Sequence, residues 1–147
     1  AMAEQIKNKP AVAVHVRFFD APGEKGINNA TRDYYARAIK EMEGRFGTNA
    51  HYFIFSDRPT DAQALLSLPE ERVTCVSHNH GDEYAYADLW LMTQCQHFII
   101  ANSTFSWWGA WLSSHPDKQV IAPGFEMREG KMWWGFEGLL PGEWIKL

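Results

Sequence analysis

Residues 97–112 read HFIIANSTFSWWGAWL, and this stretch decides how the rest of the chain is interpreted. Residues 97–101 suit a buried β-strand, and they run through Asn102, Ser103 and Thr104 directly into a helix-compatible segment. A strand that turns sharply into a helix leaves several backbone N–H groups unpaired at the positive end of the helix dipole. Ser103 or Thr104 is therefore either an ordinary N-cap or part of an anion site of the kind that binds phosphate.

Short apolar runs alternate with amphipathic segments along the rest of the chain. The helix expected at 31–46 has Thr31 or Asn29 as its candidate N-cap and Gly47 as its end. Further helices are expected at 83–94 and 103–113, with a short one ending at Leu66. Strands are expected at 11–16, 51–56, 72–76, 97–101 and 119–122. This alternation predicts an open, Rossmann-like α/β sandwich with a mostly parallel sheet of about five strands.

The composition indicates a single domain with its own core. The chain has 147 residues, of which 46% are hydrophobic. Its net charge of −4 offers no basic surface, so nucleic acid is not an expected partner. Residues 1–9 look like a cloning remnant or linker, and 125–147 are expected to wrap as loops and a short helix. We expect the whole of 1–147 to form one domain.

The two cysteines have no metal-binding spacing, so both are expected to be buried free thiols of a reducing compartment. No apolar run approaches the ~18 residues of a membrane span, and no signal peptide opens the chain. These features favour a cytoplasmic location, with membrane association of a longer parent protein left open. His78 and His80 are more typical of a polar turn than of a metal site.

Seven tryptophans are more than a routine core of this size requires. Trp107 and Trp111 are four residues apart and share one face of the helix expected at 103–113. These rings either pack the helix onto the sheet or stack against sugars, as in a carbohydrate-binding module. The second alternative requires exposed rings.

Polar side chains gather where the predicted strands end. His15 and Arg17 lie at the end of the first strand, Ser56 and Asp57 at the end of the second, and 102–104 at the end of the fourth. In open parallel sheets, ligands bind outside these carboxyl ends. A buried arginine needs an anionic partner, so Arg17 pairs either with Asp20 inside the protein or with a ligand phosphate.

Two carboxylates are candidates for reading a purine base. Asp82 or Asp88 could accept two N–H bonds from the edge of guanine, which would discriminate against adenine. Asp82 could instead cap the helix that starts at residue 83. Asp88 lies in mid-helix, where it belongs either to a solvated face or to a ligand contact.

Several motifs resemble those of one known enzyme family. They are His15-Val16-Arg17 with Asp20, and the segments 53–57, 88–92, 99–112, 120–123 and 141–146. In this order they resemble the GDP-fucose-dependent α-1,2-fucosyltransferases of glycosyltransferase family 11. The resemblance runs across nearly all of the chain, and 99–112 is its most specific part.

The resemblance implies an inverting transfer of fucose from GDP-β-L-fucose to the 2-hydroxyl of a galactoside acceptor glycan, with no metal or other cofactor. Family members resemble two-domain enzymes of the GT-B type. This chain is similar to the C-terminal, donor-binding domain alone, so the N-terminal acceptor domain would be missing. The isolated fragment is then expected to bind nucleotide without transferring sugar.

The resemblance also implies roles for individual residues. Arg17 would be catalytic and hold the β-phosphate, His15 would lie beside the nucleotide, and Asp88 would read guanine. The residues implied to bind GDP-fucose are His15, Arg17, Asp20, Asp88, Asn102, Ser103, Thr104 and Phe105.

One position departs from the family pattern. The motif His-x-Arg-Arg-x-Asp has Phe18 in place of its second arginine. Because neighbouring residues of a strand point to opposite sides, this replacement does not remove the contact expected of Arg17. The chain is then either an active fucosyltransferase or a divergent member with another donor or acceptor.

Overall fold

The computed structural model describes residues 2–18, 29–76, 82–124, 127–128, 131–132 and 140–147. The expected site residue Asp20 lies outside these ranges, as do His78 and His80.

Within the described residues, six parallel strands form one open sheet in the order β3-β2-β1-β4-β5-β8. The strands are β1 (Ala11–Val16), β2 (His51–Ser56), β3 (Val73–Cys75), β4 (His97–Ile99), β5 (Val120–Ala122) and β8 (Ile145–Lys146). The Rossmann-like α/β sandwich predicted from the sequence is confirmed, and all five expected strands are present.

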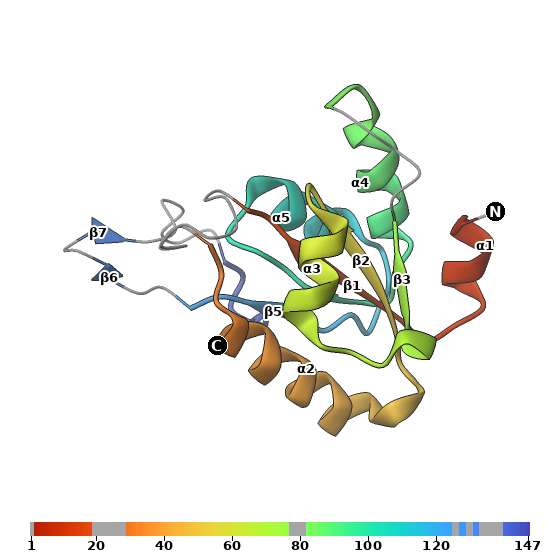
Figure 1. The fold of residues 1–147 in the computed structure, drawn as a ribbon, viewed down its shortest axis with the longest axis horizontal. Helices are drawn as coiled ribbons and strands as arrows, with labels where there is room; N and C mark the ends of the chain where they lie inside the picture. Colours follow the sequence, from red (N-terminus) through yellow and green to blue (C-terminus); the bar gives the residue numbers. More distant parts are fainter. Residues whose placement is uncertain (1, 19–28, 77–81, 125–126, 129–130, 133–139) are drawn as a thin grey trace.

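Helices cover both faces of this sheet (Figure 1). The α-helices in the described part are α1 (Met2–Lys7), α2 (Arg32–Phe46), α3 (Pro59–Leu66), α4 (Ala85–Thr93) and α5 (Thr104–Leu112). Buried residues of α2 and α3 pack on one face, and buried residues of α1, α4 and α5 pack on the other. No helix in these ranges is long and apolar enough to cross a bilayer.

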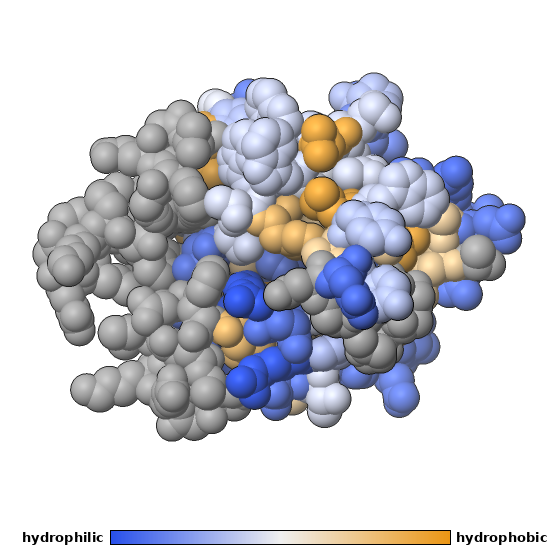
Figure 2. Space-filling model, turned by 90° about the horizontal axis from the view of Figure 1, so that it is seen from above, coloured by the Kyte–Doolittle hydropathy of each residue, from blue (hydrophilic) through white to orange (hydrophobic). Residues whose placement is uncertain are grey.

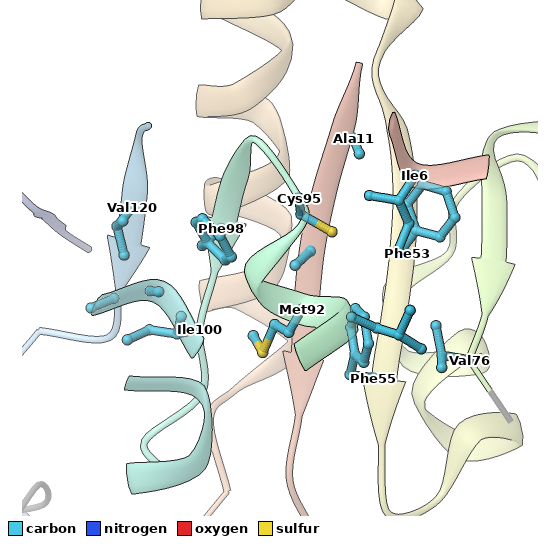
Figure 3. Packing of buried hydrophobic residues seen from close by; sticks show 14 of the residues in the cluster. Ile6, Ala11, Phe53, Phe55, Val76, Met92, Cys95, Phe98, Ile100 and Val120 are labelled. Carbon is cyan, nitrogen blue, oxygen red and sulfur yellow. The ribbon is translucent and has the colours of Figure 1, made fainter. Parts of the chain in front are cut away.

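The two-residue period of β1 separates the two layers of the core. Val12, Val14 and Val16 belong to the cluster under α2 and α3, whereas Ala11 and Ala13 belong to the cluster under α1, α4 and α5. On that second face, larger side chains from β2 and β4 fill the space beside the two alanines (Figure 3). Both faces of β1 are buried, as expected for a central parallel strand.

Helix α2 is fixed at both ends and along its buried face. Thr31 is its N-cap and accepts a hydrogen bond from the Tyr34 amide at 3.0 Å, and Gly47 ends it with a φ of 71°. The Tyr34 hydroxyl donates to the carbonyls of Ile100 and Ile121 at 2.7 and 3.0 Å. This side chain therefore ties α2 to the ends of β4 and β5.

The two termini differ from expectation. Residues 1–9 were expected to be a linker or remnant, but Met2–Lys7 is a helix whose Ile6 is fully buried in the core. At the other end, Ile145–Lys146 adds the parallel strand β8 beside β5, and the described tail contains no helix. The tail also holds a small antiparallel pair, β6 (Met127–Arg128) with β7 (Lys131–Met132).

The tryptophans and cysteines show mixed outcomes. Trp107 packs against the core and contacts Trp144, whereas Trp111 stacks on Trp107 and stays half exposed. Both cysteines are free thiols; Cys95 is buried as expected, but Cys75 is only partly buried.

Helices α4 and α5 approach closely at Gly109. A Cβ atom at this position would lie 2.6 Å from the sulfur of the buried Met92 and 3.6 Å from Leu89. Because van der Waals contact between such atoms needs a longer distance, any larger residue at position 109 would force the fully buried Met92 side chain to shift.

We expect Gly109→Ala to lower the free energy of unfolding by about 1–3 kcal/mol, the usual cost of overpacking a core. Gly44→Ala, at an exposed position of α2, is the matched control, since a Cβ there meets nothing within 4 Å. It should stabilise the protein by about 0.4–1 kcal/mol. Urea unfolding of the two variants measures both effects, and equal shifts would contradict this description of the α4–α5 contact.

Candidate functional site

The strand order reverses direction between β1 and β4. From β1 the chain continues to β2 on one side, whereas from β4 it continues to β5 on the other (Figure 1). The crevice outside the carboxyl ends of two such strands is the usual ligand site of open α/β sheets. His15 lies at the end of β1, and Asn102 to Phe105 follow β4, so these sequence-predicted residues lie where such a crevice is expected.

A direct contact joins the two strand ends. The rings of His15 and Phe105 are 5.2 Å apart between centroids and tilted by 38°. His15 comes from β1, and Phe105 from the first turn of α5. The imidazole is therefore held against the helix start that the sequence singled out as an anion site.

The imidazole of His15 is buried and has an unused polar atom. The residue is 5% exposed, and its Nδ1 has no hydrogen-bond partner among the residues that the structure describes. Burial, together with the nearby charge of Arg17, lowers the pKa of His15 to about 3, so the ring is neutral at physiological pH. An unsatisfied buried polar atom costs roughly 1–3 kcal/mol, so Nδ1 is a candidate contact for a ligand.

Helix α2 fixes the position of His15 through a buried hydrogen bond. The Tyr35 hydroxyl donates a hydrogen bond to the backbone carbonyl of His15 at 2.8 Å in the protein interior. Tyr35 and Tyr34 are adjacent on α2, and their rings contact each other edge to face. The strand end that carries His15 and Arg17 is thus held by a buried side chain.

Arg17 pairs with an aspartate that follows β2. Its Nη1 lies 3.2 Å from Oδ2 of Asp57, and Oδ1 of Asp57 accepts a hydrogen bond from the Phe18 amide at 3.1 Å. The Arg17 side chain nevertheless remains 45% exposed. Asp57 thus orients the segment after β1, and sequence reasoning did not identify it as a partner of Arg17.

The equal length of β1 and β2 could have revealed this pair. The two strands run in register from Ala11 opposite His51 to Val16 opposite Ser56. Continuing the register by one residue sets Arg17 opposite Asp57. Asp20 is therefore not required as the anionic partner of Arg17.

The turn between β4 and α5 combines an N-cap with an open donor. Ser103 is the N-cap, and its hydroxyl accepts a hydrogen bond from the Phe105 amide at 3.3 Å. The amide of Phe105, one of the residues implied by the resemblance to bind GDP-fucose, donates here to the cap. Thr104 is exposed, and its amide has no hydrogen-bond partner within the described ranges.

The remaining turn residues are mostly buried. Asn102 is 9% exposed, and the fully buried Ser106 hydroxyl accepts a hydrogen bond from the Ala101 amide at 3.2 Å. The hydroxyl of Ser106 also donates toward the Ala101 and Ser103 carbonyls. These bonds make the turn rigid, so Thr104 is presented in a fixed position.

Asp88 lies in the first turn of α4 and is partly buried. It precedes the buried Leu91 and Met92 by three and four residues, so it shares their helix face and is not on a fully solvated one. The N-cap of α4 is Tyr84, which means that Asp82 does not cap this helix. What Asp88 binds stays a prediction.

Within the described residues, no three histidine, cysteine, aspartate or glutamate side chains cluster as metal ligands.

Comparison with known proteins places this chain in a family. Residues 2–132 match the family described as Glycosyl transferase family 11. The chain belongs to this family.

Two bacterial relatives illustrate the match. An O-antigen biosynthesis glycosyltransferase, WbnK of Escherichia coli, is 40% identical over 92 residues, which cover 62% of this chain and 29% of WbnK. An alpha-1,2-colitosyltransferase of Escherichia coli is 32% identical over 126 residues, or 83% of this chain and 43% of that relative. The chain therefore spans less than half of the length of each. No solved structure matches it.

The structure explains why this chain has Phe18 where the family motif has its second arginine. Phe18 is partly buried and packs against the core cluster under α2 and α3. Its neighbour Arg17 is instead exposed and paired with Asp57. In this chain, position 18 contributes to packing, whereas position 17 carries the charge at the crevice.

We expect His15→Phe to raise stability, because it removes a buried polar atom with no partner while keeping a ring against Phe105. The wild-type pKa of about 3 lies below the ordinary value of 6.5. Above pH 6.5 the ring is neutral in both the folded and the unfolded state. As pH falls from 6.5 toward 3, the unfolded state binds a proton that the folded state does not, so the free energy of unfolding decreases. Unfolding curves across this range should show a shallower acid decline for the variant. An unchanged decline would contradict a buried neutral His15.

Proposed function

We propose that this glycosyltransferase chain binds the GDP part of GDP-fucose in the crevice between the ends of β1 and β4. In the protein to which it belongs, the site would serve the transfer of fucose to a 2-hydroxyl of a galactoside. The observation that carries the proposal is the buried His15, with its unused Nδ1, held against the start of α5. Membership of glycosyltransferase family 11 supports a sugar-nucleotide ligand.

The chemistry of the leaving group explains why these residues are needed. Breaking the bond between fucose and GDP leaves negative charge on the diphosphate, and fixed donors lower the energy of that charge. Arg17 offers a planar guanidinium that suits phosphate oxygens, and Thr104 offers an amide at the positive end of α5. We propose that these groups stabilise the leaving group without a metal or cofactor.

Asp57 acts as a positioning residue in this proposal. Its two carboxylate oxygens hold the guanidinium of Arg17 and the amide of Phe18. A long, half-exposed arginine loses side-chain freedom when it binds a phosphate, and a partner that already restrains it reduces this loss.

We propose Asp88 as the residue that selects guanine. A carboxylate accepts two N–H bonds from the guanine edge, whereas adenine would leave the carboxylate partly unsatisfied. The partly buried position of Asp88, on the same helix face as Leu91 and Met92, supports this role. GDP should therefore bind more tightly than ADP.

A second candidate concerns the sugar rather than the nucleotide. One relative is named for the transfer of colitose in an α-1,2 linkage. The donor of this chain could thus carry a sugar other than fucose in the same nucleotide site. Displacement of bound GDP by GDP-fucose and by GDP-mannose separates the alternatives, since the sugar that improves affinity over GDP identifies the donor.

We expect calorimetry to detect GDP binding that exceeds the binding of UDP or ADP, and Arg17→Met to weaken it by roughly tenfold or more. This estimate follows from the ~1.5–3 kcal/mol typical of hydrogen bonds to charged groups. Arg37→Met is the matched control, since Arg37 is 46% exposed and pairs with Asp33 on α2. Equal affinity for the three nucleotides, or an equal loss in the two variants, would contradict the proposal.

The helix start is tested in the same titration by Thr104→Pro. Proline suits the first residue of a helix, and the extended backbone of Ser103, with φ −137° and ψ 137°, is compatible with a following proline. The variant removes the amide donor and hydroxyl without breaking α5. Thr104→Val, which retains the amide, separates the two groups: GDP affinity should fall several-fold more in the proline variant. Equal affinities with equal melting temperatures would exclude the Thr104 amide as a phosphate contact.

A further inference from the structure

An exposed aromatic surface covers α4, α5 and the 3₁₀ turn η3 (Asp82–Tyr84). The most exposed large hydrophobic side chains of the described residues lie there: Tyr84, Tyr86, Trp90, Trp108, Trp111 and Leu112. Figure 2 shows the molecule from the side of α4 and α5, with orange and pale side chains gathered at the centre of this face. Apolar surface concentrated on one face marks an interaction site.

A groove lies between the last turns of α4 and α5. It has a volume of about 280 Å³, and its lining residues are Trp90, Thr93, Gln94, Cys95, Leu112, Ser114 and His115. Trp90 and Leu112 are 53% and 54% exposed and form apolar walls. Four of the other lining residues carry hydrogen-bonding side chains, and none of the seven is a carboxylate, an amine or a guanidinium.

The polar groups of the groove are already ordered. Thr93 Oγ1 donates to the Trp90 carbonyl at 2.6 Å and accepts from Gln94 Nε2 at 3.2 Å. This chain of bonds fixes the Gln94 amide and keeps its carbonyl oxygen available as an acceptor. On the α5 side, Ser114 and His115 line the groove with a hydroxyl and an imidazole. Fixed polar groups of this kind favour a ligand with several hydroxyl groups.

We propose that this groove binds a neutral saccharide, with one pyranose face against the Trp90 indole and hydroxyls bonded to Gln94, Ser114 and His115. A pyranose combines an apolar C–H face with a polar rim, which matches an aromatic wall beside neutral hydrogen-bonding groups. A phosphate or carboxylate ligand would find no opposite charge among the lining residues.

The groove is separate from the proposed nucleotide site. Helix α5 begins at Thr104 beside the crevice and ends at Leu112 in the groove, so about 12 Å of helix lies between them. A saccharide bound here is therefore not the donor sugar. It fits a remote unit of an extended glycan acceptor, held by the protein away from the transfer point.

The test follows the indole N–H signal of Trp90 by two-dimensional NMR of the 147-residue chain. Lactose, cellobiose and maltose are the probes, and glycerol is the polyol control. We expect a saturable shift with at least one disaccharide and none with glycerol. In Trp90→Ala, the affinity for the disaccharide is measured from the NMR signals of the other groove residues. It should fall by about tenfold or more. Trp108→Ala, whose side chain is 46% exposed and does not line the groove, should leave it unchanged.

Three results would overturn the proposal: no saturable shift with any disaccharide, an equal response to glycerol, or shifts that depend on protein concentration instead of sugar. The last result would identify the surface as a contact between copies of the chain. GDP titration of Trp90→Ala accompanies the test. Because the two sites are separate, Trp90→Ala should bind GDP with the affinity of the wild type, whether or not the disaccharides bind.

Discussion

The contact between the rings of His15 and Phe105 is the interaction on which the candidate site depends. It joins the end of β1 to the first turn of α5 across the point where the strand order reverses. Tyr35 holds His15 from the side of α2, and the Ser103 cap holds Phe105 in the first turn of α5. The hydrogen-bond donors beside this contact are therefore already in place in the free protein, which lowers the entropy cost of binding a ligand.

The buried imidazole of His15 opposes stability, whereas the apolar core around it supports stability. His15 is buried with an unused nitrogen, although burial of a polar group without a partner is unfavourable. The surrounding sheet compensates, because both faces of β1 are packed with apolar side chains. Functional positions often carry such a local loss of stability, because the surrounding rigid structure holds them in place.

Features set by local periodicity were predictable, whereas those set by distant partners were not. The alternation of apolar runs predicted the five strands. Thr31 and Ser103 were each one of two candidate N-caps, and Gly47 was the expected end of its helix. The strand β8 has two residues, too few for any period, and is recognised only by its pairing with β5. The pairing of Arg17 with Asp57 depends on the β1–β2 register, which the equal strand lengths allow but do not fix. The exposure of Trp90 depends on how α4 lies on the sheet. Burial and register are tertiary properties, so composition alone could not supply them.

The central claim is that a nucleoside diphosphate binds between the ends of β1 and β4. The most direct measurement is a map of amide and imidazole chemical shifts during titration with GDP. The largest changes are expected at the Thr104 amide and the His15 ring, with smaller changes along β1. Changes confined to the groove at the far ends of α4 and α5, or no changes at saturating GDP, would contradict the claim.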